Sequence, residues 1–192
     1  MRGPVILLCA LCGVVVSLAG CGNDRAPLAS GPPAPSKHTE ALRFARAGMR
    51  LDLPSNLDVT RDLKAPAVFR ASLGEPFVSA FAYSRKEQLP RNAKELGQAR
   101  KRLADTTRKR DPTYRLASAR ATEVAGARTV ELMGEQTLSR RRLTVRSIHV
   151  YKGRAEYVIE IAAPVRQFPR FDRGVTPVIQ RTLRVTGRVR GS

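Results

Sequence analysis

The chain has 192 residues, with 35 Lys and Arg against 16 Asp and Glu, which gives a formal net charge of +19. Hydrophobic residues make up 42% of the sequence, which is too large a share for a wholly disordered chain. The length suits one domain with a tail, and no run of about 20 apolar residues is present. We therefore expect a folded domain without a conventional membrane-spanning helix.

The first 20 residues are predicted to be a secretory signal. Arg2 supplies a short positive start, and residues 5–19 form an apolar stretch of the length that such signals use. The stretch ends at Leu18-Ala19-Gly20-Cys21, which resembles the lipobox of bacterial lipoproteins. The resemblance implies cleavage before Cys21 and attachment of a diacylglyceryl group to its thiol. The alternative is an ordinary cleaved signal in which the cysteine stands by chance.

The three cysteines of the chain are Cys9, Cys12 and Cys21. Two would leave with the signal and the third would carry lipid, so the mature chain is expected to have no disulfide and no thiolate chemistry. Stable anchoring needs about two acyl chains, which a diacylglyceryl group supplies. These expectations place the protein in the bacterial cell envelope, held to the membrane by its lipid, with its domain outside the cytoplasm.

Residues 21–37 are predicted to be a disordered tether. They include Pro27, Pro32, Pro33 and Pro35 among small residues, a composition typical of linkers. A single domain is expected over residues 38–192, and nearly all of the positive excess belongs to it.

Patterns typical of strands dominate this domain. The runs with such patterns are 49–53, 68–73, 77–83, 114–124, 128–136, 143–151 and 155–162. The connections between the last three are only a few residues long, whereas a parallel crossover needs a dozen or more. We therefore predict that these three strands form an antiparallel meander.

Two helices are predicted between and after the strands. The first begins at Asn92, which with Glu95 fits a capping box, and it ends before Asp111-Pro112. Its outer face is cationic. The second lies near residues 168–183, with Pro177 inside its apolar pattern. Pro177 predicts either a kink or a helix that starts there with Thr176 as its cap.

The order of these elements predicts an α+β domain in which helices cover an antiparallel β-sheet. Residues 48–54, the mid-chain helix, the three-strand meander and the closing amphipathic helix resemble the PsbP-like α/β/α sandwich. That family includes photosystem II extrinsic subunits and LpqN-type lipoproteins. The resemblance implies binding or assembly work without catalysis, and it supplies no catalytic motif.

His149 is the one residue that suits an enzyme. A general base needs a partner that fixes its tautomer, and Asp172 or Glu156 could serve, with Ser147 on the same strand face. The alternative is a hydrogen-bonded structural histidine. Glu156 and Glu160 share a strand face about 13 Å apart, and each is expected to pair with an arginine. We expect no catalytic residue, no metal site and no cofactor, because the sequence has no clustered metal ligands and no nucleotide-binding glycine pattern.

The basic surplus is the strongest unusual feature. Six basic residues with no acid between them lie at Arg140, Arg141, Arg142, Arg146, Lys152 and Arg154, and the first helix adds a second cluster over residues 100–110. Such a surface attracts polyanions, and arginine forks match phosphate groups. The residues that we select as a candidate anion-binding surface are Arg140, Arg141, Arg142, Arg146, Lys101 and Arg102.

The first hypothesis for function is a non-catalytic domain that binds a protein or another envelope component, and the alternative is a tethered domain that binds a polyanion through the basic surplus. A domain that binds an envelope protein would show an apolar groove or an exposed sheet edge. A domain that binds an anionic lipid or wall polymer would bring residues 140–142 together with the helix cluster. The excess of 28 Arg over 7 Lys is also typical of a GC-rich genome, so the charge could be compositional. Nucleic acid is not an expected partner, because no nucleic-acid module is recognisable.

Overall fold

The computed structural model describes residues 33–61 and 63–189, so the predicted signal, Cys21 and most of the tether lie outside the described residues. None of the helices within those two ranges is both long and apolar enough to cross a bilayer. The elements in chain order are β1 (Thr39–Phe44), β2 (Met49–Pro54), β3 (Asp58–Thr60), β4 (Ala67–Ser72), β5 (Phe77–Ser84), α1 (Ala93–Arg110), β6 (Arg115–Val124), β7 (Ala127–Leu138), β8 (Arg141–Lys152), β9 (Ala155–Pro164), α2 (Phe168–Thr182) and β10 (Arg184–Val185).

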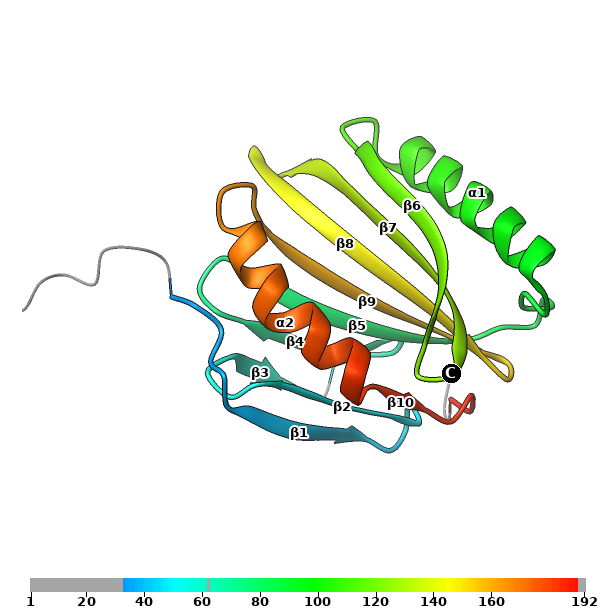
Figure 1. The fold of residues 1–192 in the computed structure, drawn as a ribbon, viewed down its shortest axis with the longest axis horizontal. Helices are drawn as coiled ribbons and strands as arrows, with labels where there is room; N and C mark the ends of the chain where they lie inside the picture. Colours follow the sequence, from blue (N-terminus) through cyan, green and yellow to red (C-terminus); the bar gives the residue numbers. More distant parts are fainter. Residues whose placement is uncertain (1–32, 62, 190–192) are drawn as a thin grey trace, which may run out of the picture. The chain divides into compact units, whose positions relative to one another are not determined.

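The larger of the two sheets is antiparallel and has the strand order β3-β4-β5-β9-β8-β7-β6. The predicted meander is confirmed as β7, β8 and β9, which pair in sequence order. The chain leaves β5, runs through α1 to the far edge at β6, and returns strand by strand until β9 lies beside β5 (Figure 1). This route puts the two ends of α1 near opposite ends of the sheet.

The smaller sheet has the order β1-β2-β10 and was only partly predicted. The strand from residue 49 is confirmed as β2, but β1 and β10 have weak patterns. β1 has only Leu42 and Phe44 as regularly spaced large apolar residues, and β10 is two residues long. Both strands form because they can pair with β2, which is a long-range effect that local patterns do not show.

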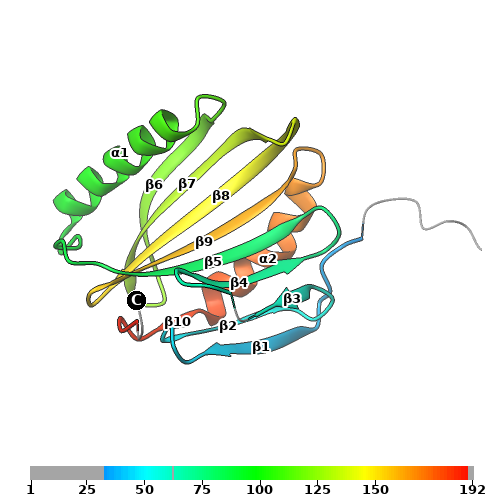
Figure 2. The same ribbon diagram turned by 180° about the vertical axis from the view of Figure 1, so that it is seen from behind.

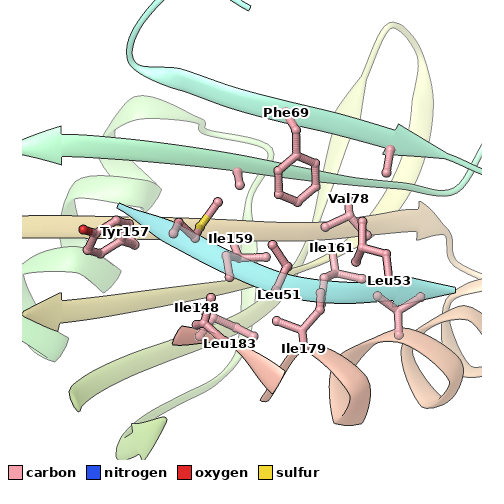
Figure 3. Packing of buried hydrophobic residues seen from close by; sticks show 14 of the residues in the cluster. Leu51, Leu53, Phe69, Val78, Ile148, Tyr157, Ile159, Ile161, Ile179 and Leu183 are labelled. Atoms are coloured by element: carbon pink, nitrogen blue, oxygen red, sulfur yellow. The ribbon is translucent and has the colours of Figure 1, made fainter. Parts of the chain in front are cut away.

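The main core lies between the large sheet, α2 and the small sheet (Figure 3). Leu51 of β2, Phe69 of β4, Ile159 of β9 and Ile179 of α2 are all at most 1% exposed. α2 lies in front of the large sheet in Figure 1 and behind it in Figure 2, so it covers one face. Hydrophobic burial on this side stabilises the fold by roughly 25 cal/mol per Å² of apolar surface removed from water.

α2 begins at Phe168, so the alternative start with Thr176 as cap is wrong. The helix runs through Pro177, although an interior proline costs about 3 kcal/mol or more. Phe171, Val175 and Ile179 are buried along one face of α2, and their burial outweighs this cost.

α1 covers the opposite face of the large sheet. Its buried Leu96 and Ala99 pack against Val130 and Leu132 of β7, whose alternate neighbours face the main core. One of the two hydrogen bonds of the predicted capping box is confirmed, because the Asn92 side chain accepts a hydrogen bond from the Glu95 backbone N–H at 2.9 Å. The prediction of an α+β domain with helices on both faces of an antiparallel sheet is therefore confirmed.

Candidate anion-binding surface

The tip of the β7–β8 hairpin carries the predicted arginine run. Ser139 and Arg140 form the turn, with φ of 48° and 65°, and Leu138 pairs with Arg141 across it. Two positive φ values are what a tight hairpin turn of this length requires, because they match the twist of the flanking strands. The turn holds Arg140 out in solvent at the end of the sheet.

Two of the hairpin arginines have acidic partners. Arg141 forms an ion pair with Glu75, and Arg142 lies 2.5 Å from a carboxylate oxygen of Glu135. The side chains of Arg141 and Arg142 are 68% and 73% exposed. Exposed pairs of this kind contribute only about 0–1 kcal/mol, so a stronger anion can compete for both guanidinium groups.

The basic end of α1 reaches the same end of the sheet. The last turn of α1 contains Arg108, Lys109 and Arg110. The loop after it is joined to the end of β7, where the Thr137 backbone N–H donates to Thr113 Oγ1 at 2.9 Å. A hollow of about 390 Å³ at this junction is lined by Pro112, Thr113, Arg115, Glu135, Gln136, Thr137 and Arg142. The last turn of α1 and the hairpin arginines therefore lie at the same end of the sheet, whereas the start of the helix cluster does not.

We call this region the hairpin-end surface. Its basic residues are Arg108, Lys109, Arg110, Arg115, Arg140, Arg141 and Arg142. Arg115 is not among the candidate residues expected from the sequence, although its position in the chain indicates that it belongs to this surface. It starts a strand after a four-residue connection from the basic helix end, so it must lie beside that end.

Lys101 and Arg102 do not join the hairpin arginines. Both are exposed on α1, and neither has a hydrogen-bond or ion-pair partner among the described residues. Arg102 precedes Arg110 by about 12 Å along the helix axis, at about 1.5 Å per residue. They extend the basic character of the hairpin-end surface along the outer side of α1.

Arg146 is not a surface residue, and we leave it out of the candidate surface. Its side chain is 12% exposed and points to the α2 side of the sheet. Its guanidinium group donates to Asp172 at 2.8 and 2.9 Å and also bonds to Glu131. Burial by itself lowers the pKa of Arg146, but the hydrogen bonds and charges of Asp172 and Glu131 raise it overall. These contacts make Arg146 part of an internal ion network.

His149 lies on the other face of the sheet, in contact with Glu156 and not with Asp172. Its Nδ1 is 2.8 Å from Glu156 Oε1, and Arg85 Nε donates to Glu156 Oε2 at 2.7 Å. Burial alone raises the pKa of Glu156, but the hydrogen bonds and charges of His149 and Arg85 lower it overall. The expected pairing of Glu156 with an arginine is confirmed, and His149 is hydrogen-bonded to Glu156 but to no nucleophile among the described residues.

Glu160 does not follow the expected pairing. Within the described part of the chain its carboxyl group has no hydrogen bond and no ion pair, and Ser147 lies directly across from it on β8. Burial raises the pKa of the Glu160 carboxyl, and the charges of His149 and Arg110 offset this only in part. Its ionised form is therefore disfavoured in the folded state.

Replacing Glu160 by Gln is expected to stabilise the protein near neutral pH. A carboxyl whose folded pKa is raised costs stability as the pH rises through that pKa, so the gain should vanish as the pH falls below the ordinary value of 4.5. Urea unfolding at several pH values measures it. Glu156→Gln is the matched comparison, because the pKa of Glu156 is lowered. Its substitution should instead destabilise the protein above pH 4.5, and equal effects of the two changes would contradict the prediction.

An exposed sheet edge and a groove were the two features expected of a protein-binding domain, and both are found beside β1, although the groove is not purely apolar. β1 is an edge of the small sheet, and a hollow of about 520 Å³ beside it is lined by apolar Phe44, Leu63 and Val68 as well as by Arg43 and Arg46. The hollow is thus partly apolar and partly cationic, and it does not point to a purely apolar partner.

Comparison with models of known protein families finds no match for this chain. Comparison with curated proteins finds no match either. The fold is similar to the solution structure of cyanobacterial PsbP (CyanoP) from Synechocystis sp. PCC 6803, with a TM-score of 0.56 and 9% sequence identity over 83% of this chain and 98% of that one. It is also similar to the crystal structure of LpqN, involved in cell envelope biogenesis of Mycobacterium tuberculosis, with a TM-score of 0.56 and 13% identity over 78% and 91%. The predicted PsbP-like fold is confirmed.

Proposed function

We propose that this chain is a lipid-anchored protein of the bacterial cell envelope whose domain binds an anionic lipid or wall polymer and catalyses no reaction. The anchor rests on Cys21 and the lipobox-like residues before it. The envelope role is supported by a fold shared with LpqN, itself involved in cell envelope biogenesis. The absence of catalysis is an inference from His149, which among the described residues is hydrogen-bonded to Glu156 but to no nucleophile such as Ser147.

The observation that carries the proposal is the convergence at the hairpin-end surface. Two basic segments that are separate in sequence, the end of α1 and the β7–β8 hairpin, are joined at one end of the sheet. Among the described residues, the side chains of Lys109 and Arg140 have no acidic partner, and Arg110 forms no ion pair, although its charge acts on Glu160. A surface of this kind gains free energy from a polyanion by releasing its counterions.

Binding to anionic vesicles is expected to depend on the hairpin. The mature chain with Cys21→Ser lacks the lipid, so any membrane binding must come from the domain. It should sediment with vesicles containing phosphatidylglycerol and not with purely zwitterionic ones. Each basic residue near an anionic surface contributes about 1 kcal/mol. Replacing Arg140, Arg141 and Arg142 together by Gln should therefore weaken binding by up to about 100-fold at low salt.

A control variant that loses the same number of charges elsewhere distinguishes an effect of the hairpin-end surface from an effect of the net charge of the domain. Lys64, Lys86 and Arg154 are exposed and lie outside the hairpin-end surface, so their replacement by Gln removes the same charge elsewhere. An equal loss of binding in both variants would overturn the role of the hairpin. A soluble glycerol-phosphate polymer tested in the same way distinguishes a wall polymer from a lipid as the preferred ligand.

Salt dependence tests the polyanion assignment itself. Binding to anionic partners should fall steeply with salt and be lost near roughly 0.5 M, where the screening length is only a few ångströms. An envelope protein retained by the domain through such a wash would argue for a protein partner instead.

A further inference from the structure

The outer face of the small sheet carries a row of three arginines. The strand register pairs Arg43 of β1 with Arg50 of β2, and Arg50 with Arg184 of β10. Residues directly opposite one another in antiparallel strands have Cβ atoms about 4.5–5.5 Å apart. We call these three residues the arginine row.

The arginine row faces solvent because the strands alternate. Leu42 and Leu51 point into the main core and are each 1% exposed, whereas Arg43, Arg50 and Arg184 are exposed. The three side chains therefore project from the same face, away from α2 and the large sheet. Their neighbourhood is set by strand pairing and not by flexible loops.

The positive charge of the arginine row is not neutralised within the described residues. The side chains of Arg43 and Arg50 have no hydrogen bond and no ion pair there, and the Arg184 guanidinium group donates only to the backbone carbonyls of Arg181 and Leu183, at 3.0 and 2.7 Å. Like charges directly opposite each other on neighbouring strands destabilise a sheet. The register therefore places two unfavourable contacts side by side, and an anion would relieve both.

Two hollows lie against the arginine row. All three arginines line both of them. The first, of about 370 Å³, adds Arg181 from the end of α2 and one acid, Asp52. The second, of about 440 Å³, is also lined by Phe44, Met49 and Val185, whose side chains pack against the main core on the other face of the sheet. A charged group can thus lie over the arginine row with four arginines around it.

We propose that the arginine row, with Arg181, is a discrete binding site for a phosphate-type oxyanion, such as the phosphate of a monoester or diester. The guanidinium fork matches phosphate oxygens in a bidentate manner, and guanidinium groups lose little hydration on binding. A tetrahedral phosphate has enough oxygens to accept from several arginines at once. Three side chains already held as neighbours lose less conformational freedom than mobile ones would.

This site is distinct from the hairpin-end surface. The first residues of α2 lie near the hairpin, because the Gln167 side chain donates to Glu75 at 3.3 Å and Glu75 pairs with Arg141. The far end of α2 leads directly into Arg184. The 15 residues of the helix therefore separate the two regions by roughly 22 Å. Removing one surface leaves the other intact, so the two proposals can fail independently.

Calorimetric titration of the mature Cys21→Ser chain with inorganic phosphate, at constant ionic strength set by chloride, tests the site. Arg50→Gln removes the central arginine and is expected to weaken phosphate binding at least tenfold. It should fold, because it also removes both like-charge contacts. Arg50→Lys keeps the positive charge but loses the bidentate guanidinium group, and this variant should bind phosphate more weakly than the native protein. Phosphate binding by Arg50→Gln at native strength would overturn the proposal.

Arg166→Gln is the matched control. Arg166 is exposed between β9 and α2, at the end of the helix remote from Arg184, and it lines neither hollow. Its substitution should leave phosphate binding unchanged. An equal loss in Arg166→Gln and Arg50→Gln would mean that phosphate responds only to net charge, and the site would be rejected.

The source of the phosphate is resolved by two further probes. Glycerol 3-phosphate carries the charged group alone, and a short-chain phosphatidic acid carries the same group with acyl chains. Tighter binding of the lipid, lost in Arg50→Gln, supports the site with a lipid phosphate as its ligand. Equal binding of the two probes, again lost in Arg50→Gln, supports the site with a soluble phosphate ester.

Discussion

Replacing Arg146 by Met is expected to lower the free energy of unfolding by about 3–5 kcal/mol, because it leaves buried carboxylates without their partner. Glu131 is 2% exposed and Asp172 is 17% exposed, and both bond to the Arg146 guanidinium group. Arg120 remains beside Glu131 at 3.0 Å, but its own side chain is 61% exposed, and Asp172 keeps only the hydroxyl of Thr176 as a partner, at 2.6 Å. Urea denaturation near neutral pH measures the loss.

Arg142→Met is the control for this prediction. It removes the same group from the same strand, but the pair of Arg142 with Glu135 is exposed and should contribute less than about 1 kcal/mol. Adding Glu131→Gln to Arg146→Met should recover part of the stability, because one buried negative charge is then gone. Similar losses in Arg142→Met and Arg146→Met would contradict the internal placement of Arg146.

Replacing Leu51 by Ala is expected to cost about 2–5 kcal/mol, the range for a leucine truncated in a packed core. Leu51 is 1% exposed at the centre of β2, where the small sheet meets α2 and the large sheet (Figure 3). The same strand carries Arg50 outward, so loosening it should also weaken phosphate binding at the arginine row. Urea denaturation and the phosphate titration measure the two effects.

Leu138→Ala is the comparison for Leu51→Ala. Leu138 is 52% exposed at the hairpin tip, so its truncation should change stability by no more than about 0.5 kcal/mol. A cost for Leu51→Ala as small as that of Leu138→Ala would show that the small sheet is not part of the cooperative core.

Most of the large sheet could be predicted from local sequence. The β7–β8–β9 meander has strong apolar patterns and short connections, and each of its strands lies beside the next one in the chain. The cap at Asn92 is also local, since the residues that satisfy it are within three positions. Pro177 was harder to interpret, because the outcome depended on burial of the α2 face and not on the proline itself.

The candidate site was less predictable than the fold. The sequence grouped Arg146 with Arg140, Arg141 and Arg142, yet strand alternation and the packing of α2 turn Arg146 inward to Asp172. The arginine row could not be foreseen at all. β1 and β10 have little pattern of their own, and Arg50 meets Arg184 only because the chain returns from α2 to the edge of β2.

The amino-acid sequence by itself determined the lipobox-like segment, the excess of basic residues and the main strands and helices, because each depends on residues that are neighbours in the chain. Only the tertiary structure decided which basic residues are buried in ion pairs, which converge at the hairpin-end surface and which stand unpaired in the arginine row. The reason is physical: strand register and helix packing join positions far apart in sequence, and the electrostatic environment of a charge depends on distance in space.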